Sequence, residues 1–245
     1  MNCDRIAPLY VVGERLIFGH ALDRCRNVQL SNLGRHEAAL VCGDGDGRFL
    51  RSLVRSRAAT NVDYVDVSGR MTALARRRIG QQSGGRGPDV EFFCADIREL
   101  QSPRRYDLIA THFFLDCFGD DEIHEVIEVI ASHAAGNATW LVSEFQIPQS
   151  GVARHAGSLV IGGLYAAFRL LTGLRARRLP AYRAALAACG FVCAADLSSL
   201  GGLLTSQLWR RSFDDNDRSG GEQDTFGRAT MRVDQNPTVI REERP

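Results

Sequence analysis

Short apolar runs alternate along this chain with segments whose apolar positions recur at helical spacing. The run EAALVCG ends at Gly43 and predicts a strand, and RFLRSLVRS over residues 48–56 predicts the helix that follows it. The same pattern predicts strands over VDYVDVS, VEFFCAD, YDLIATHFFL and TWLVSEFQIP, and helices over MTALARRRIG, DDEIHEVIEVIASHA and LPAYRAALAACG. Strands that alternate with helices predict an α/β fold with a doubly wound, mainly parallel sheet covered on both faces.

The segments around this alternating region predict additions to the sheet. Residues 1–30 carry one apolar stripe at helical spacing, which predicts a helical lid segment. Residues 31–211 form the main domain, whose last part, FVCAADLSSLGGLLTSQLWRR, predicts a terminal antiparallel hairpin. Within this domain we expect the apolar segment at about 150–180 to lie over the carboxyl edge of the sheet as a second lid. Residues 212–245 are polar, so we expect a disordered tail.

The composition excludes several classes of protein. With 245 residues, 44% hydrophobic content and a formal net charge of +1, the chain is typical of a globular domain and gives no sign of binding nucleic acid. No apolar window reaches the length of a transmembrane helix, and no signal peptide is recognisable. The seven cysteines include no C-x-x-C pair, which favours reduced thiols and a cytoplasmic location. The apolar segment 158–174 leaves peripheral contact with a membrane open.

Three glycines at alternate positions, Gly43, Gly45 and Gly47, lie between the first strand and its helix. Such a turn places backbone N–H groups at a helix N-terminus, where dinucleotides and S-adenosylmethionine can bind. The dinucleotide pattern G-x-G-x-x-G requires a third glycine where this chain has Arg48 or Leu50. Aspartates between the glycines would also repel a pyrophosphate, so a ligand with a free amino group and a sulfonium charge fits better.

The stretch LVCGDGDGRFL resembles the first motif of class I S-adenosylmethionine-dependent methyltransferases, in which G-x-G-x-G follows an apolar strand. The later strand ends keep the order of that family over about residues 36–145, and the hairpin near 190–211 matches it more weakly. The resemblance implies a Rossmann-like fold with a seven-stranded sheet. It also implies S-adenosyl-L-methionine as cofactor and methyl transfer to a small molecule.

The resemblance further implies roles for individual residues. Asp66, at the end of VDYVDVS, matches the acid that binds both ribose hydroxyls, and charge-assisted hydrogen bonds of this kind contribute about 1.5–3 kcal/mol each. Asp96 matches the acid that meets the adenine amino group, and Ile97 would offer its backbone N–H to the ring. Met71 would lie near the adenine face, and Val67 is a further residue expected to bind the cofactor. The full set predicted to bind the cofactor is Gly43, Asp44, Gly45, Gly47, Asp66, Val67, Met71, Asp96, Ile97 and Thr111.

One position departs from the pattern of this family. The family commonly has an acid two residues before the first glycine, where this chain has Val41. Asp44, inside the turn, is our candidate to replace that acid at the amino group of the cofactor. Each aspartate also has a purely structural alternative, because Asp44 and Asp46 suit a turn and Asp66 and Asp96 can cap the helices that follow them.

The end of YDLIATHFFL places Thr111 and His112 at the sheet edge where open parallel sheets bind ligands, with Asp116 just beyond. His112 is a candidate general base for an acceptor hydroxyl or amine, and the alternative is a histidine hydrogen-bonded across the cleft. The stretch HEVIE at His124 falls short of the zinc motif H-E-x-x-H, because its last position is a glutamate. We therefore predict no metal site.

The sequence thus predicts methyl transfer to a small or medium, hydrophobic acceptor, and it leaves the acceptor atom and the oligomeric state open. Arginines beside the apolar segment at about 150–180 suggest an acceptor that carries an anionic group. A noncatalytic methyltransferase-like partner subunit is one alternative, since Val41 replaces an acid of the family. A nicotinamide-dependent Rossmann oxidoreductase is a second alternative, which Arg48 and the terminal hairpin disfavour.

Replacing Asp44 by asparagine tests the role of this acid. If Asp44 holds the amino group of the cofactor, Asp44→Asn weakens cofactor binding at least several-fold, because the negative charge is lost. Calorimetric titration with S-adenosylhomocysteine measures the change, and an unchanged affinity would show that Asp44 makes no such contact.

Overall fold

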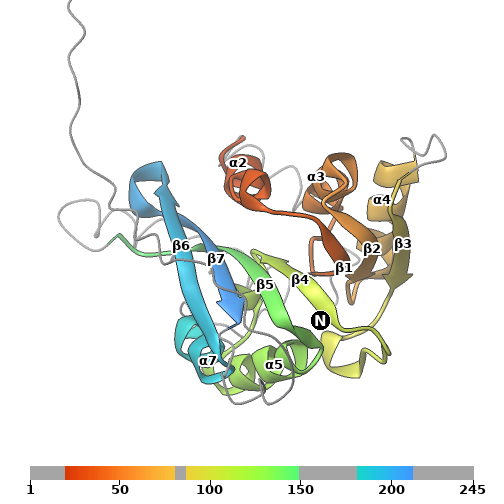
Figure 1. Cartoon of the computed structure of the whole chain (residues 1–245). Coiled ribbons are helices and arrows are strands. Elements are labelled where there is room, and N and C mark those ends of the chain that lie inside the picture. The colour runs from red at the N-terminus through yellow and green to blue at the C-terminus, as the bar shows by residue number, and fades with distance from the viewer. Residues whose placement is uncertain (1–19, 81–86, 149–180, 212–245) are drawn as a thin grey trace, which may run out of the picture. The chain divides into compact units, whose positions relative to one another are not determined.

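A computed structural model describes residues 20–80, 87–148 and 181–211 (Figure 1). Strands and helices alternate along them as the apolar pattern predicts. The strands are β1 (His36–Cys42), β2 (Ala59–Val65), β3 (Asp89–Phe93), β4 (Tyr106–His112), β5 (Ala134–Phe145), β6 (Phe191–Ser199) and β7 (Leu204–Arg211). The α-helices are α2 (Ala21–Asn27), α3 (Arg48–Ser56), α4 (Gly69–Gly80), α5 (Asp120–Ser132) and α7 (Tyr182–Ala188). Single 3₁₀ turns are η2 (Leu30–Asn32), η3 (Ile97–Glu99), η4 (Leu115–Cys117) and η5 (Leu200–Gly202).

The described strands form one seven-stranded sheet in the order β3-β2-β1-β4-β5-β7-β6. Strands β1 to β5 pair in parallel, whereas β7 runs antiparallel to both β5 and β6. The chain moves from β1 outward to β3 and then crosses to the other side of β1 to form β4. The predicted doubly wound, mainly parallel sheet with a terminal antiparallel hairpin is confirmed.

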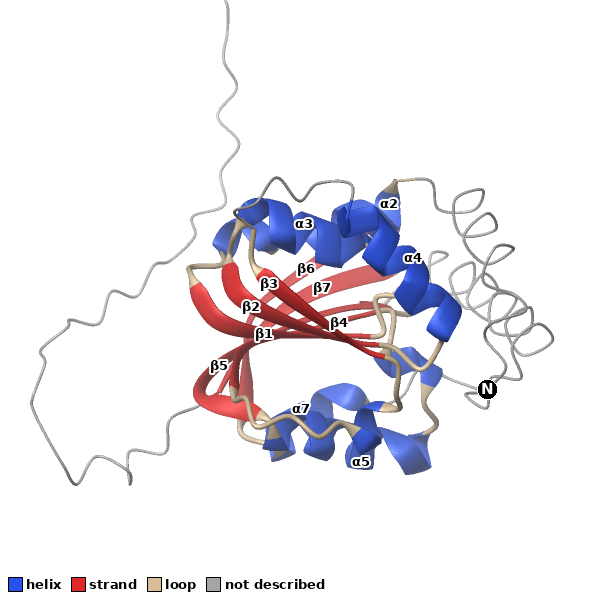
Figure 2. Ribbon diagram, turned by 90° about the vertical axis from the view of Figure 1, so that its right-hand side faces the viewer, coloured by secondary structure: helices blue, strands red, loops and turns tan. Residues whose placement is uncertain are grey.

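Helices cover both faces of the sheet, with α2, α3 and α4 on one face and α5 and α7 on the other (Figure 2). The core under α3 contains Phe49, Leu50 and Leu53, which pack on the alternate residues of β1 that point to that face. The opposite core contains Trp140 among side chains of α5 and α7. The inner parallel strands β1 and β4 are therefore buried on both faces, which explains why they read as nearly continuous apolar runs, whereas the outer strand β3 is only partly buried.

Several sequence-based boundaries differ from the structure. The fourth strand was expected to continue through Leu115, but β4 ends at His112 because Phe113 takes a left-handed conformation with φ of 54°. Strand β2 begins at Ala59 and β5 at Ala134, both earlier than expected, because pairing with neighbours extends each strand beyond its apolar part. Of the predicted helical segment 1–30, the structure describes α2 and η2. The predicted lid at 150–180 and the tail at 212–245 lie outside the described residues.

Helices α3 and α4 approach each other closely at Gly47, the residue before α3. Gly47 has φ of 78°, and a Cβ atom placed on it would lie 2.7 Å from Cβ and 2.8 Å from Cα of Ala75 in α4. Any side chain at position 47 would thus meet both backbone strain and a steric clash.

Gly47→Ala should therefore lower the free energy of unfolding by about 2 kcal/mol or more. Gly34→Ala is the matched control, because a Cβ atom at Gly34 meets nothing within 4 Å. Chemical denaturation of both variants measures the difference, and equal stability of the two would contradict the close approach of α3 and α4.

Candidate active site at the carboxyl edge of the sheet

The register of the parallel strands aligns the carboxyl ends of β1, β2 and β4, so the loops that follow these strands begin side by side in one row. Cys42 at the end of β1 lies beside Val65 of β2 and Thr111 of β4. Gly43 and Asp66, which follow β1 and β2, are consequently neighbours, and the Gly43 N–H donates to the Val65 carbonyl at 2.8 Å. This row lies where the strand order changes direction between β1 and β4, the position at which open α/β sheets bind ligands.

The glycine turn, residues 43–47, packs against other parts of the protein at two of its three glycines. Gly43 has φ of 60°, and a Cβ atom on it would lie 2.1 Å from a ring carbon of Phe114. Gly47 packs on Ala75. Gly45 also has φ of 60°, but among the described residues a Cβ atom on it would meet only the Met71 sulfur, 3.9 Å away. The space over Gly43 and Gly47 is thus filled by the chain, and Gly45 is the glycine whose free side a ligand can approach.

Asp66 connects the turn to the end of β2. One of its carboxylate oxygens accepts from the Gly45 N–H at 3.2 Å and from the Tyr64 hydroxyl at 3.3 Å, and the other accepts from the Ser68 N–H at 2.9 Å. The Tyr64 hydroxyl also donates to the Gly45 carbonyl at 2.5 Å. Asp66 is only partly buried, so its oxygens can accept further hydrogen bonds from a ligand at the edge. Its predicted contact with ribose remains a prediction.

The two aspartates inside the turn are engaged by the protein. Asp44 is buried, and its carboxylate accepts from the first-turn N–H groups of α3 at Phe49 (3.2 Å) and Leu50 (2.8 Å). Burial raises the pKa of Asp44 to about 7. Asp46 forms ion pairs with Arg48 and Arg78. These contacts support the structural alternative for both side chains, and cofactor contact by Asp44 remains a prediction.

The predicted adenine side lies at the ends of β2 and β3. Asp96 caps η3 by accepting from the Arg98 N–H at 3.0 Å, and the Arg98 guanidinium also binds its carboxylate at 2.7 Å. These hydrogen bonds from Arg98 lower the pKa of Asp96. Val67 is 53% exposed, whereas Met71 and Ile97 are buried. An exposed valine directly after Asp66 offers an apolar surface, and sequence reasoning missed the Arg98 partner of Asp96.

Thr111 and His112 point to opposite faces of the sheet, and both side chains are buried. The Thr111 hydroxyl accepts a hydrogen bond from the Trp140 indole at 3.0 Å. The alternation of β4 turns this side chain into the core, and its predicted contact with the cofactor stays a prediction.

His112 is held inside the structure. Its Nδ1 lies 2.9 Å from the Ser143 hydroxyl, and its ring lies 4.2 Å from the Phe49 ring. Burial, with the positive charge of Arg26 as a smaller cause, lowers the pKa of His112 to about 3. A buried, neutral imidazole matches the alternative of a histidine hydrogen-bonded across the strands better than a general base.

Sequence reasoning did not single out Glu144, at the end of β5. Its side chain is fully buried and accepts from two N–H groups of the loop after β4. The available signal was a glutamate inside the apolar run WLVSEF, since an isolated acid in a buried strand requires partners.

The sequence and the structure of this chain are similar to those of known proteins. Residues 40–139 match the family model described as a methyltransferase domain. The likeness to a methyltransferase domain thus covers the central part of the chain. The match begins in β1 and ends in β5, so it spans the glycine turn, Asp66, Asp96 and the end of β4. No curated protein sequence matches the chain.

Solved structures with the same fold cover most of this chain. The N-methyltransferase NodS from Bradyrhizobium japonicum WM9, in complex with S-adenosyl-L-homocysteine, has a TM-score of 0.55 at 15% identity over 80% of this chain and 88% of its own. Magnesium protoporphyrin IX methyltransferase (ChlM) from Synechocystis PCC 6803, with bound SAH, has a TM-score of 0.56 at 20% identity over 78% and 82%. The mitomycin 7-O-methyltransferase MmcR has a TM-score of 0.60 at 17% identity over 79% and 55%. At these identities the likeness establishes the fold.

Acid titration tests the buried state of His112. Folded His112 stays neutral down to a pKa of about 3, whereas the unfolded chain binds this proton below about pH 6.5, so His112 lowers stability as pH falls through that window. Carboxyls with raised pKa, such as Asp44, have the opposite effect on stability. The difference in free energy of unfolding between His112→Gln and wild type removes their contribution, because both proteins contain them. The stability of His112→Gln relative to wild type should rise by about 1 kcal/mol per pH unit from pH 6 to 4.

Chemical denaturation at each pH gives these differences. His124→Gln, at an exposed position on α5, is the control and should follow wild type. Parallel curves for His112→Gln and wild type would show that His112 is not held neutral.

Proposed function

We propose that this protein transfers a methyl group from S-adenosyl-L-methionine to a small-molecule acceptor. The proposal depends most on Asp66, a partly exposed carboxylate hydrogen-bonded to the Gly45 N–H, at the β1–β4 switch of a methyltransferase domain. The placement of Asp66 beside the open glycine supports a site for a ligand with vicinal hydroxyls.

The remaining residues of this edge fit the parts of that cofactor. Asp66 would accept the two ribose hydroxyls, and the exposed Val67 with Met71 would lie beside the adenine ring. Asp96 would accept from the adenine amino group next to its contacts with Arg98, since a carboxylate has four lone-pair positions. Gly45 would provide the close approach of the backbone.

Bound S-adenosyl-L-methionine supplies a methyl group already activated on a sulfonium sulfur. The contribution of the protein is then to orient the acceptor in line with that methyl group and to exclude water. This task requires no strong base, which agrees with a neutral, buried His112. We therefore infer that the chain acts by positioning, and that no proton acceptor is needed from β4.

An apolar wall at the same edge supports a hydrophobic acceptor. The buried apolar side chains of α2 pack with Phe113 and Phe145, which follow β4 and end β5. We propose that this part of the N-terminal segment borders the acceptor position, as the predicted lid requires. The acceptor atom stays open, and the similar structures include both an N- and an O-methyltransferase.

The location of the protein in the cell and its contact with membranes are proposals as well. No helix in the described ranges is long and apolar enough to cross a membrane. A cytoplasmic location remains a prediction from the cysteine pattern, and peripheral membrane contact through 158–174 lies outside the described residues.

Calorimetric titration with S-adenosylhomocysteine, and separately with NAD, tests the proposed function. We expect micromolar binding of S-adenosylhomocysteine and none of NAD. Asp66→Ala should weaken binding at least 30-fold, roughly the loss of one charge-assisted hydrogen bond of about 2 kcal/mol. Asp66→Asn, which keeps one acceptor oxygen for the Gly45 N–H, should fall between Ala and wild type.

Glu91→Ala is the matched control, because Glu91 is an exposed acid on the outer strand β3. It should bind like wild type. If NAD binds and S-adenosylhomocysteine does not, the proposed function is wrong and the oxidoreductase alternative gains support. If neither binds, the partner-subunit alternative gains support.

A further inference from the structure

Glu144 is a fully buried carboxylate at the carboxyl end of β5, next to the candidate active site. Its Oε1 atom accepts from the Phe114 N–H at 3.1 Å and from the Leu115 N–H at 2.8 Å. Among the described residues its Oε2 atom is buried without a hydrogen-bond partner. A side chain of β5 therefore holds the backbone of the loop that follows β4.

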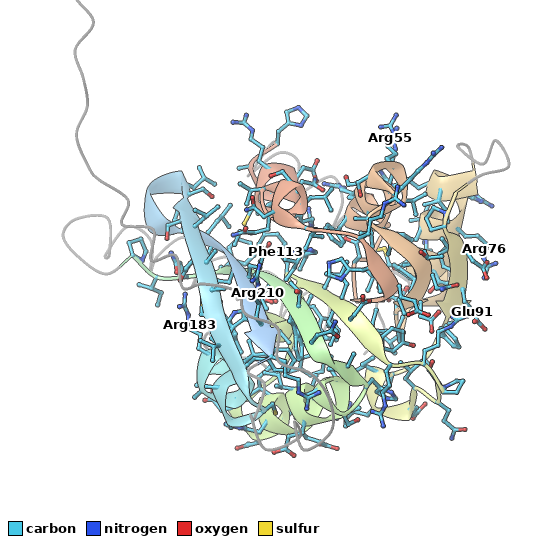
Figure 3. The ribbon with its side chains drawn as sticks, in the orientation of Figure 1. Arg55, Arg76, Glu91, Phe113, Arg183 and Arg210 are labelled. Carbon is cyan, nitrogen blue, oxygen red and sulfur yellow. The ribbon has the colours of Figure 1, made fainter. Side chains whose placement is uncertain are left out.

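This loop, Phe113–Phe118, has a shape that a free chain would rarely adopt. Phe113 is a non-glycine residue with φ of 54°, and its N–H donates to the Ser143 carbonyl at 2.7 Å (its position is labelled in Figure 3). The first three N–H groups of the loop are thus bound by two consecutive residues of β5, Ser143 and Glu144. A left-handed phenylalanine costs about 1–3 kcal/mol, so the loop depends on these contacts for its shape.

The shape of the loop determines where Phe114 lies. The ring of Phe114 occupies the space beside Gly43, where a Cβ atom would lie 2.1 Å from it. The Phe118 ring meets the Phe114 ring edge-on at 5.0 Å between centroids. Phe114 is therefore the contact between the loop after β4 and the glycine turn after β1.

Glu144 is also costly to bury, which argues against a purely stabilising role. Burial and the nearby Asp116 carboxyl raise the pKa of Glu144, and burial raises the pKa of Asp116 to about 6. A carboxyl group with a raised pKa lowers stability at neutral pH, because it must either be held protonated or ionise in apolar surroundings. Acids in such positions cluster at functional sites.

We propose that Glu144 is a positioning residue of the cofactor site: by holding the loop 113–118 it sets Phe114 against the glycine turn and so forms the wall of the site at the end of β4. This inference rests on the proposed function, since it assumes that the glycine turn binds S-adenosyl-L-methionine. It assigns to β5 a part in cofactor binding, and Glu144 acts there through Phe114.

Two substitutions of Glu144 separate positioning from general stability. Glu144→Ala removes the acceptor, so the dissociation constant of S-adenosylhomocysteine should rise at least 10-fold, as measured by calorimetry. Glu144→Gln keeps an acceptor oxygen for the two N–H groups and should stay within 3-fold of wild type. The melting temperature of each variant is measured alongside.

Asp107→Ala is the matched control. Asp107 also accepts from two backbone N–H groups, those of Glu37 and Ala38 at 3.0 and 2.9 Å, but it lies at the opposite edge of the sheet. It should lower the melting temperature and leave the dissociation constant within 2-fold of wild type. If Asp107→Ala weakens binding as much as Glu144→Ala, or if Glu144→Ala binds like wild type, the inference is wrong.

Phe114→Ala tests the same inference should Glu144→Ala fail to fold. Phe114 is only partly buried, and loss of its ring should raise the dissociation constant at least 5-fold. Unchanged or tighter binding by Phe114→Ala would overturn the role of Phe114 as a wall. Failure of the proposed function and failure of this inference give different results. If the wild-type protein binds no S-adenosylhomocysteine, both are wrong. If wild type binds it and the variants bind equally well, the inference alone is wrong.

Discussion

The backbone between β1 and α3 turns through three glycines in the left-handed conformation, and neighbouring elements pack closely against two of them. Gly43 meets Phe114 of the loop after β4, and Gly47 meets Ala75 of α4. Among the described residues this packing holds the turn at Gly43 and Gly47 and leaves Gly45 open to a ligand. A turn that is fixed by packing presents its open position without a further entropy loss on binding.

Carboxylates bound to backbone N–H groups fix the loops at this edge. Asp44 accepts from the first turn of α3, Asp66 from the glycine turn, Asp96 from η3 and Glu144 from the loop after β4. A buried carboxylate is unfavourable by itself, and hydrogen bonds from main-chain donors offset that cost. Burial raises the pKa of Asp44 and of Glu144 although backbone hydrogen bonds lower it, so these hydrogen bonds only partly offset the cost of burial. The two buried carboxyls therefore lower the stability of the fold while they hold the loops at this edge.

Such an edge suits a reaction in which geometry matters more than proton transfer. The imidazole of His112 is neutral and enclosed by Phe49 and Ser143, so it adds to the rigidity of the site. Methyl transfer needs an in-line approach of acceptor and methyl group in surroundings without water. If the protein transfers a methyl group as we propose, the loops held by carboxylates and the apolar packing by α2 would orient the acceptor and exclude water.

The sequence by itself determined the alternation of strands and helices, the glycine turn and the acids at the strand ends, because these depend on local periodicity and on residues with special backbone freedom. It also indicated the methyltransferase resemblance, which the family match confirms. Only the tertiary structure decided where individual side chains point. Asp44 turned to α3, Thr111 turned to Trp140, and the β4 loop came to rest on Glu144, a residue 30 positions from Phe114. The contacts of Thr111 with Trp140 and of Glu144 with Phe114 join residues 29 and 30 positions apart, so they arise from packing and register, and no local pattern contains them.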